Sequence, residues 1–288
     1  MWLLPLIAFF IFGSISYLLR RYLAQHIHHE SKLINLVFYV VFLLPAGIVG
    51  GLFLANGNLV PSISAVLALV AASLLWPLYY LASFRAAKDL DAGVLSMLAD
   101  TSVIVTMVVS FFVFHERLSV LQIVGVFCLI FSGAVAAWPD IKWHMRLRGG
   151  GLAAAVVATV LLGLGVVIDK VAYSTAGLGQ YLLYSWPLQA LWMMIIARKD
   201  IKRIPKFLSK DNAYRSLVLL HGAVGTVRSL AFGLAILLSA SVTAMNAASN
   251  FLSIAIIVAA YFVLKEREHL VYKFAGALLG LTGLYILA

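Results

Sequence analysis

The sequence has 288 residues, of which 64% are hydrophobic and only 11% are charged. A water-soluble domain needs charge on roughly a quarter of its residues to cover its surface, so this composition excludes an ordinary soluble protein. The net charge of +10 comes from Lys and Arg residues in short clusters between apolar segments. This pattern argues against nucleic acid as a partner and favours anionic lipid headgroups.

Ten apolar segments follow one another along the chain, each close to the roughly 20 residues that cross a bilayer as a helix. The first lacks a basic n-region and a small-residue cleavage site, so we expect an uncleaved span rather than a signal peptide. The predicted spans are residues 2–20, 33–55, 62–84, 92–114, 119–138, 151–173, 180–197, 216–238, 242–264 and 270–288.

Most of the 21 Lys and Arg residues lie in the odd-numbered connections between these spans. The first connection holds Arg20, Arg21 and Lys32, and the ninth holds Lys265, Arg267 and Lys273. Because short cytoplasmic loops retain basic residues, the pattern predicts that the odd connections are cytoplasmic and that both termini lie outside.

A shift of 150 positions aligns much of the sequence with itself, which indicates an internal repeat. Two units follow, residues 1–140 and 151–288, each with five predicted spans. Five is odd, so the units face opposite ways across the membrane, as in many secondary transporters. The fold prediction is an all-α membrane protein of ten transmembrane helices in two inverted five-helix repeats. The matched pairs are Phe112 with Phe262, Val113 with Val263, Glu116 with Glu266, Arg117 with Arg267, Leu129 with Leu279, Gly133 with Gly283, Gly13 with Gly163, and Arg20 with Lys170.

Each half closes with a similar stretch, FFVFHERLSVLQIVGVFCLIFSGAVAAW in the first and AYFVLKEREHLVYKFAGALLGLTGLYIL in the second. Both carry a Glu-Arg pair between two spans and a following helix that contains glycine. On these stretches the chain resembles the drug/metabolite transporter superfamily, in its EamA-like branch. The resemblance implies a ten-helix carrier of the cytoplasmic (inner) membrane. It also implies a central cavity lined mainly by spans 1, 3, 4, 6, 8 and 9, with spans 5 and 10 at the periphery.

Three polar residues lie at similar depth in the predicted spans. Arg228 is about 18 Å into its span at 1.5 Å per residue, and Asp100 and Asn250 are each about 12 Å into theirs. An ionisable group in a span costs at least about 2.5 kcal/mol on insertion scales, so it needs a partner or a wet cavity. We expect Arg228 to bind an anionic group of a substrate and Asp100 to bind a cationic group or a coupling proton. The alternative is a buried structural pair of Asp100 with Arg228.

Two further sets of side chains are candidates for lining a cavity. Asn246, Ser249 and Asn250 share one helical face, although hydrogen bonds that join spans would also explain them. Trp76, Tyr79 and Tyr80 form an aromatic patch suited to stacking or cation–π contact with a substrate. Ordinary packing explains the patch equally well.

The sixth predicted span carries Asp169 and Lys170 after Gly163 and Gly165. The glycines would let the helix bend or break, exposing backbone groups and these two charges to a substrate. The rival interpretation is an ion pair at the membrane interface. Gly276 and Gly280 form a GxxxG motif that suits close packing, either within a monomer or in a homodimer.

No motif predicts a cofactor or a metal. The spacing of His26, His28, His29 and Glu30 does not fit a metal site, and Cys128 is the single cysteine. No P-loop or nucleophile elbow is present, so ATP-driven transport and membrane-embedded enzyme chemistry are disfavoured.

The sequence favours a secondary carrier of a small polar, amino acid-like metabolite, with lipid and a coupling proton as further partners. A phosphate-bearing or lipid-linked solute, bound by Arg228 and Lys170, is the second candidate.

Overall fold

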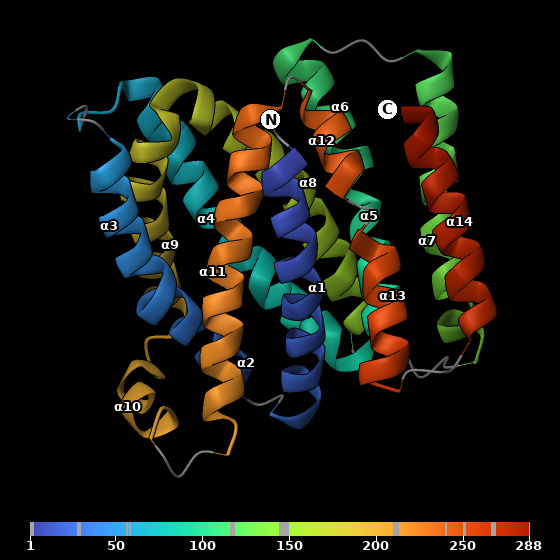
Figure 1. Cartoon of the computed structure of the whole chain (residues 1–288), viewed down its shortest axis with the longest axis horizontal. Coiled ribbons are helices and arrows are strands. Elements are labelled where there is room, and N and C mark those ends of the chain that lie inside the picture. Colours follow the sequence, from blue (N-terminus) through green and yellow to red (C-terminus); the bar gives the residue numbers. More distant parts are fainter. Residues whose placement is uncertain are drawn as a thin grey trace.

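The computed structural model describes residues 3–27, 30–55, 57, 59–115, 119–143, 150–209, 213–239, 241–249, 252–265 and 269–287. Within these residues the chain forms helices and their connections, without β-strands. Six of the described helical segments are long and apolar enough to cross a membrane. The first helix begins and the last helix ends at the same end of the bundle (Figure 1).

Helices occupy each segment that the sequence predicts as a span, with some of them interrupted or extended. The elements are α1 (Leu3–His26), α2 (Ser31–Val37), η2 (Phe38–Leu43), α3 (Leu44–Leu54), α4 (Ile63–Asp89), α5 (Ala92–Asp100), α6 (Ser102–Phe114), α7 (Val120–Trp143), α8 (Gly151–Gln180), η4 (Tyr181–Ser185), α9 (Trp186–Ile196), η5 (Ile201–Arg203), α10 (Ile204–Phe207), α11 (Arg215–Leu238), α12 (Val242–Ser249), α13 (Leu252–Val263) and α14 (Leu270–Leu287).

Two segments contain a π-helical turn directly before a proline. The turn η2 precedes Pro45 of α3, and η4 precedes Pro187 of α9. Proline has no N–H and its ring clashes with the carbonyl four residues earlier, so the regular i→i−4 ladder cannot continue through it. A π-turn widens the helix locally and absorbs this break.

The break in α8 lies at Gly177, not at the glycines predicted to bend it. Gly177 has φ 74° and ψ 168°, a conformation that glycine adopts without steric cost. Gly163 and Gly165 remain helical and buried. A Cβ on Gly163 would lie 2.6 Å from Val105 Cβ, so Gly163 allows α8 to approach α6 closely. The prediction of a broken helix at these two glycines was therefore wrong.

Two helix ends are capped by basic side chains. Lys170 Nζ of α8 donates to the carbonyl oxygens of Ile236 (3.0 Å) and Ser239 (2.7 Å) at the end of α11. Arg21 Nη1 of α1 donates to the carbonyls of Ala87 (2.6 Å) and Lys88 (3.2 Å) at the end of α4. Helix C-termini carry unpaired carbonyls and partial negative charge, so a cation there stabilises the end.

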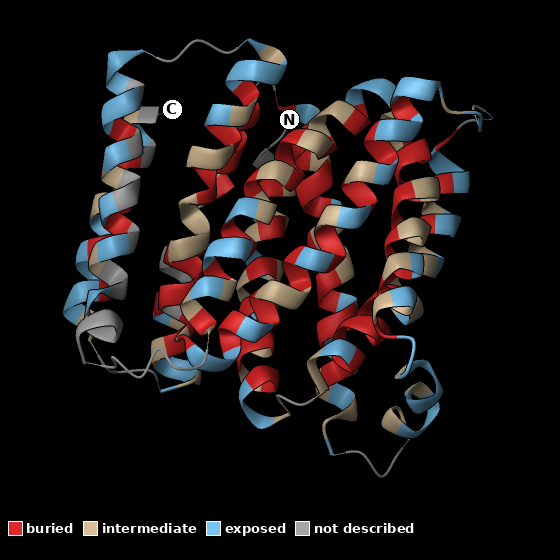
Figure 2. Cartoon of the chain, turned by 180° about the vertical axis from the view of Figure 1, so that it is seen from behind, coloured by how far each residue is buried: buried red, intermediate tan, exposed pale blue. Residues whose placement is uncertain are grey.

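The helices α7 and α14 pack along each other at one edge of the bundle (Figure 1), where much of their surface is exposed (Figure 2). Ser132 Oγ of α7 donates to the Gly276 carbonyl of α14 at 2.9 Å. A Cβ on Gly280 would lie 2.8 Å from Ser132 Oγ, so a larger residue there would require the Ser132 side chain to move. The GxxxG face therefore packs on α7 within one chain.

Several basic residues that were counted with the connections lie within helices in the structure. Arg20 and Arg21 belong to α1, which extends to His26, and Lys273 belongs to α14. Asp91, at the start of α5, accepts from Arg21 Nη2 at 3.2 Å and from Lys273 Nζ at 2.7 Å. Lys273 is only 3% exposed. Asp91 therefore joins α1, α5 and α14 through paired charges.

Replacing Asp91 with Asn should leave two largely buried cations without their carboxylate. We expect the free energy of unfolding to fall by about 2 kcal/mol, because breaking a buried ion pair is costly. Thermal unfolding of the detergent-solubilised protein measures this. Asp200→Asn is the matched control, since Asp200 pairs with the half-exposed Arg203 and should contribute little. Equal effects of the two substitutions would contradict the assignment.

Candidate functional site

Arg228 lies in the middle of α11 and is 4% exposed. Its Nη1 donates to the Tyr80 hydroxyl at 3.4 Å. Its Cζ atom lies 5.7 Å from the ring centres of both Phe9 and Tyr17 and 5.8 Å from that of Tyr80. These distances fit cation–π contacts. The Nε atom is buried without a hydrogen-bond partner in the described part of the chain.

Two cavities meet at Arg228. We call them the tryptophan cavity and the serine cavity, and Arg228 and Phe232 line both. The other residues of the tryptophan cavity include Trp76, Tyr80, Asp169, Tyr173, Tyr181, Trp186, Gln189 and Ser229. The other residues of the serine cavity include Tyr17, Tyr79, Ser96, Asp100, Asn246, Ser249 and Ser253. Arg228 thus offers its positive charge to both spaces, each of which also holds one aspartate.

Asp169 of α8 supplies the carboxylate of the tryptophan cavity. It is 3% exposed and accepts hydrogen bonds from Trp76 Nε1 (3.0 and 3.1 Å to its two oxygens) and from the Tyr181 hydroxyl (2.7 Å). These donors come from α4 and η4, so three segments position one carboxylate. The interfacial ion pair that the sequence offered as an alternative does not form, because Asp169 and Lys170 point to different partners.

Asp100 supplies the carboxylate of the serine cavity and accepts a hydrogen bond from Ser253 Oγ at 2.6 Å. Asn246 also lines this cavity and joins α12 to α6 by donating to Thr106 Oγ1 at 2.8 Å. Ser249 lines it as well and donates to the Asn246 carbonyl at 2.7 Å. Asn246 therefore combines both roles that the sequence left open. Asn250 lies outside the residues that the structure describes.

Arg20 is a second buried guanidinium close to Arg228, and the sequence analysis did not select it. It is 0% exposed, and its Nη1 donates to Ser83 Oγ. Its Cζ atom lies 4.8 Å from the Tyr80 ring centre and 5.2 Å from that of Tyr17. Both rings also contact Arg228. Tyr17 and Arg20 are three residues apart on one face of α1, a spacing visible in the sequence.

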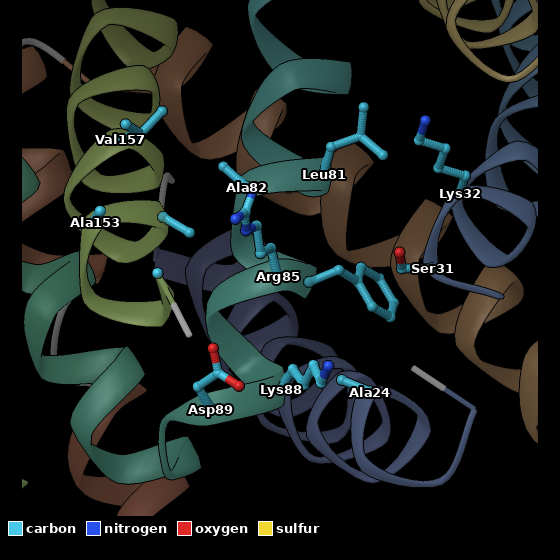
Figure 3. A pocket seen from close by; sticks show the side chains of 13 residues that line it. Ala24, Ser31, Lys32, Leu81, Ala82, Arg85, Lys88, Asp89, Ala153 and Val157 are labelled. Atoms are coloured by element: carbon cyan, nitrogen blue, oxygen red, sulfur yellow. The ribbon is translucent and has the colours of Figure 1, made fainter. Parts of the chain in front are cut away.

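A wider pocket opens at the end of the bundle where α4 ends and α8 begins. Lys32, Arg85 and Lys88 surround it, with Asp89 as its acidic member (Figure 3). These side chains are exposed, whereas Phe84 on its inner wall is buried. The pocket, which we call the basic pocket, thus places several positive charges outside the buried site.

Residues 1–138 match the EamA-like transporter family. This matched segment covers slightly less than half of the chain. This match confirms the resemblance to the drug/metabolite transporter superfamily, whose EamA-like members are membrane transporters rather than enzymes. Together with the apolar helices it makes the chain an integral membrane protein. No curated protein matches the sequence at a significant level.

Most of the predicted site residues line the two cavities around Arg228. Lys170 does not line either one, since its ammonium group is bound to the end of α11. The sequence could not separate Lys170 from Arg20, its counterpart in the repeat, because both are basic residues near the end of a long apolar segment. Only the packing of α1 and α8 against their neighbours shows that Lys170 caps a helix and that Arg20 is a buried charge.

Replacing Lys170 with Gln should weaken the cap on α11 without altering substrate binding. The loss of two hydrogen bonds from a charged donor should lower the free energy of unfolding by about 1 to 2 kcal/mol. Thermal unfolding in detergent measures the change, and exposed Lys199→Gln is the matched control. A large loss of substrate affinity at unchanged stability would instead place Lys170 in the binding site.

Proposed function

We propose that this protein is a secondary active carrier that moves a small polar metabolite across the cytoplasmic membrane by alternating access around Arg228. The observation that carries this proposal is the position of Arg228, buried in α11 where two cavities meet, each with one aspartate. Ionisable groups inside membrane-spanning bundles are costly and mark substrate pathways in many transporters. The family match supports transport as the general function.

Several features support two inverted five-helix repeats, residues 1–140 and 151–288. The close pairing of α4 with α8 has a counterpart in α11 with α1, as a twofold axis between the halves would require. Each half has a π-turn before a proline in its second segment. Each has a basic cap from its first helix onto its third. His115 and Lys265, 150 positions apart, both adopt positive φ after a helix. Alternating access would then exchange the conformations of the halves.

An amino acid-like substrate would place its carboxylate on Arg228 and its ammonium group near Asp169 or Asp100. Trp76 and Tyr80 line the same tryptophan cavity and would stack on the rest of the molecule. Asp100, with Ser253 as its donor, would alternatively carry a coupling proton. A phosphate-bearing substrate would need a second cation other than Lys170, which already binds two carbonyls.

Replacing Arg228 with Gln or Ala should abolish saturable uptake by reconstituted vesicles at low substrate concentration. A charge-assisted hydrogen bond contributes roughly 1.5 to 3 kcal/mol, so affinity should fall about 10- to 100-fold. The substrate for this assay comes from a thermal-shift screen of metabolites on the solubilised protein, since a ligand of the folded state raises its apparent stability.

Arg203→Gln is the control for this experiment, because Arg203 is an exposed arginine of η5 and lines neither cavity. It should transport with normal affinity. Normal uptake by both Arg228 variants would end the proposal that Arg228 binds substrate. Uptake without saturation or counterflow would indicate a channel instead of a carrier.

A further inference from the structure

We propose, on the basis of the transport function proposed above, that Arg20 and Arg228 together bind a doubly negative group of the substrate, a phosphate monoester or a dicarboxylate. Arg20 lies in α1 and Arg228 in α11, and these helices pack along each other. The Tyr80 ring centre is 4.8 Å from Arg20 Cζ and 5.8 Å from Arg228 Cζ. The Tyr17 ring contacts both guanidinium groups as well, at 5.2 and 5.7 Å.

Neither guanidinium has a carboxylate partner among the residues that the structure describes. The ion pairs between described residues involve Arg21, Arg203 and Lys273, and none reaches Arg20 or Arg228. Arg20 Nε and Nη2 and Arg228 Nε are buried donors without a hydrogen-bond acceptor among the described atoms. Buried charges are normally paired, and two like charges repel strongly where water is excluded. The missing counter-charge therefore points to an anion that comes from outside the chain.

The number of uncompensated positive charges at the site favours a dianion over a monoanion as the ligand. Asp169 and Asp100 line the two cavities beside Arg228, and each already accepts hydrogen bonds from neutral donors. Arg20 lines neither cavity, so these carboxylates do not meet its charge. A monoanion on Arg228 would leave Arg20 uncompensated. A phosphate or a pair of carboxylates supplies enough oxygen acceptors and charge for both guanidinium forks.

The basic pocket gives such an anion a route toward Arg20. Phe84 lines this pocket, and its ring centre is 5.7 Å from Arg20 Cζ. Phe84 also contacts the ring of His221, whose two nitrogens are buried without partners among the described residues. Lys32, Arg85 and Lys88 around the pocket would raise the local concentration of anions (Figure 3). Phe84 is thus the side chain that must move for the pocket to reach the paired arginines.

The first test measures binding to the wild-type protein in detergent by titration calorimetry at low and high ionic strength. The probes are glycerol 3-phosphate, succinate, lactate and alanine. At least one of the two dianions should bind about tenfold or more tightly than lactate, and salt should weaken it more. A preference for only one dianion identifies phosphate or dicarboxylate as the source.

Binding of lactate or alanine as tight as that of both dianions would overturn this inference while leaving the proposed carrier in place. Binding of neither dianion would overturn it also. If the wild-type protein binds these solutes but transports none of them saturably, the proposed function would be overturned instead.

The second test replaces Arg20 with Gln. The variant should lose the preference for the dianion. Its affinity for the dianion should fall to its affinity for lactate, while the affinity for lactate changes less than about twofold. Arg203→Gln makes the same change at an exposed arginine and should keep the preference. A full dianion preference in the Arg20→Gln protein would contradict the two-arginine site.

Arg20→Lys keeps the charge but removes the planar fork, so it serves as the second variant where Arg20→Gln does not fold. It should retain the salt dependence of dianion binding but lose part of its affinity. Unchanged dianion affinity in Arg20→Lys would show that the guanidinium of Arg20 does not hold the ligand.

Discussion

The burial of two guanidinium groups inside a membrane-spanning bundle is the constraint on which the site depends. Such charges are unfavourable in a low-dielectric interior unless other groups compensate them. In the described structure the compensation comes from tyrosine rings and hydroxyls, mainly Tyr17 and Tyr80, rather than from carboxylates. Rings and hydroxyls stabilise the cations only partly, which keeps their remaining donors available for an anion. These contacts of Arg20 and Arg228 with the tyrosines join α1, α4 and α11.

Much of the helical architecture could be predicted because apolar length is a local property of the sequence. The ends of the helices could not, because they depend on distant partners. Arg21 lies beyond the first predicted span, residues 2–20, whereas in the structure it pairs with Asp91 and α1 continues to His26. The π-turns before Pro45 and Pro187 are a second example. A proline predicts an interruption of the helix, but whether the helix forms a kink, a π-turn or a break there depends on packing against the neighbouring helices.

For the site residues, the sequence predicts the depth of a side chain in the membrane but not the direction in which it points. Counting residues along a span located Arg228, Asp100 and Asn250 at similar depth. The structure places Arg228 and Asp100 on the serine cavity, and Asn250 lies outside the described residues. Counting does not reveal the direction of a side chain, and Lys170 therefore resembled a ligand for substrate although it caps α11. Arg20 was missed for the converse reason. Its partners are rings of α1 and α4, and aromatic patches in apolar helices are most often ordinary packing.

The central claim is that the space beside Arg228 opens in turn to the two sides of the membrane. The most direct measurement uses a protein in which Cys128 is replaced with Ser and Ser229, beside Arg228 in the tryptophan cavity, is replaced with Cys. A membrane-impermeant thiol reagent is applied to vesicles of each orientation, with Val227→Cys on the exposed surface of α11 as the control. Alternating access predicts that the Ser229→Cys protein reacts from both sides and the control from neither. Reaction of the Ser229→Cys protein from one side only, or from neither, would contradict the account.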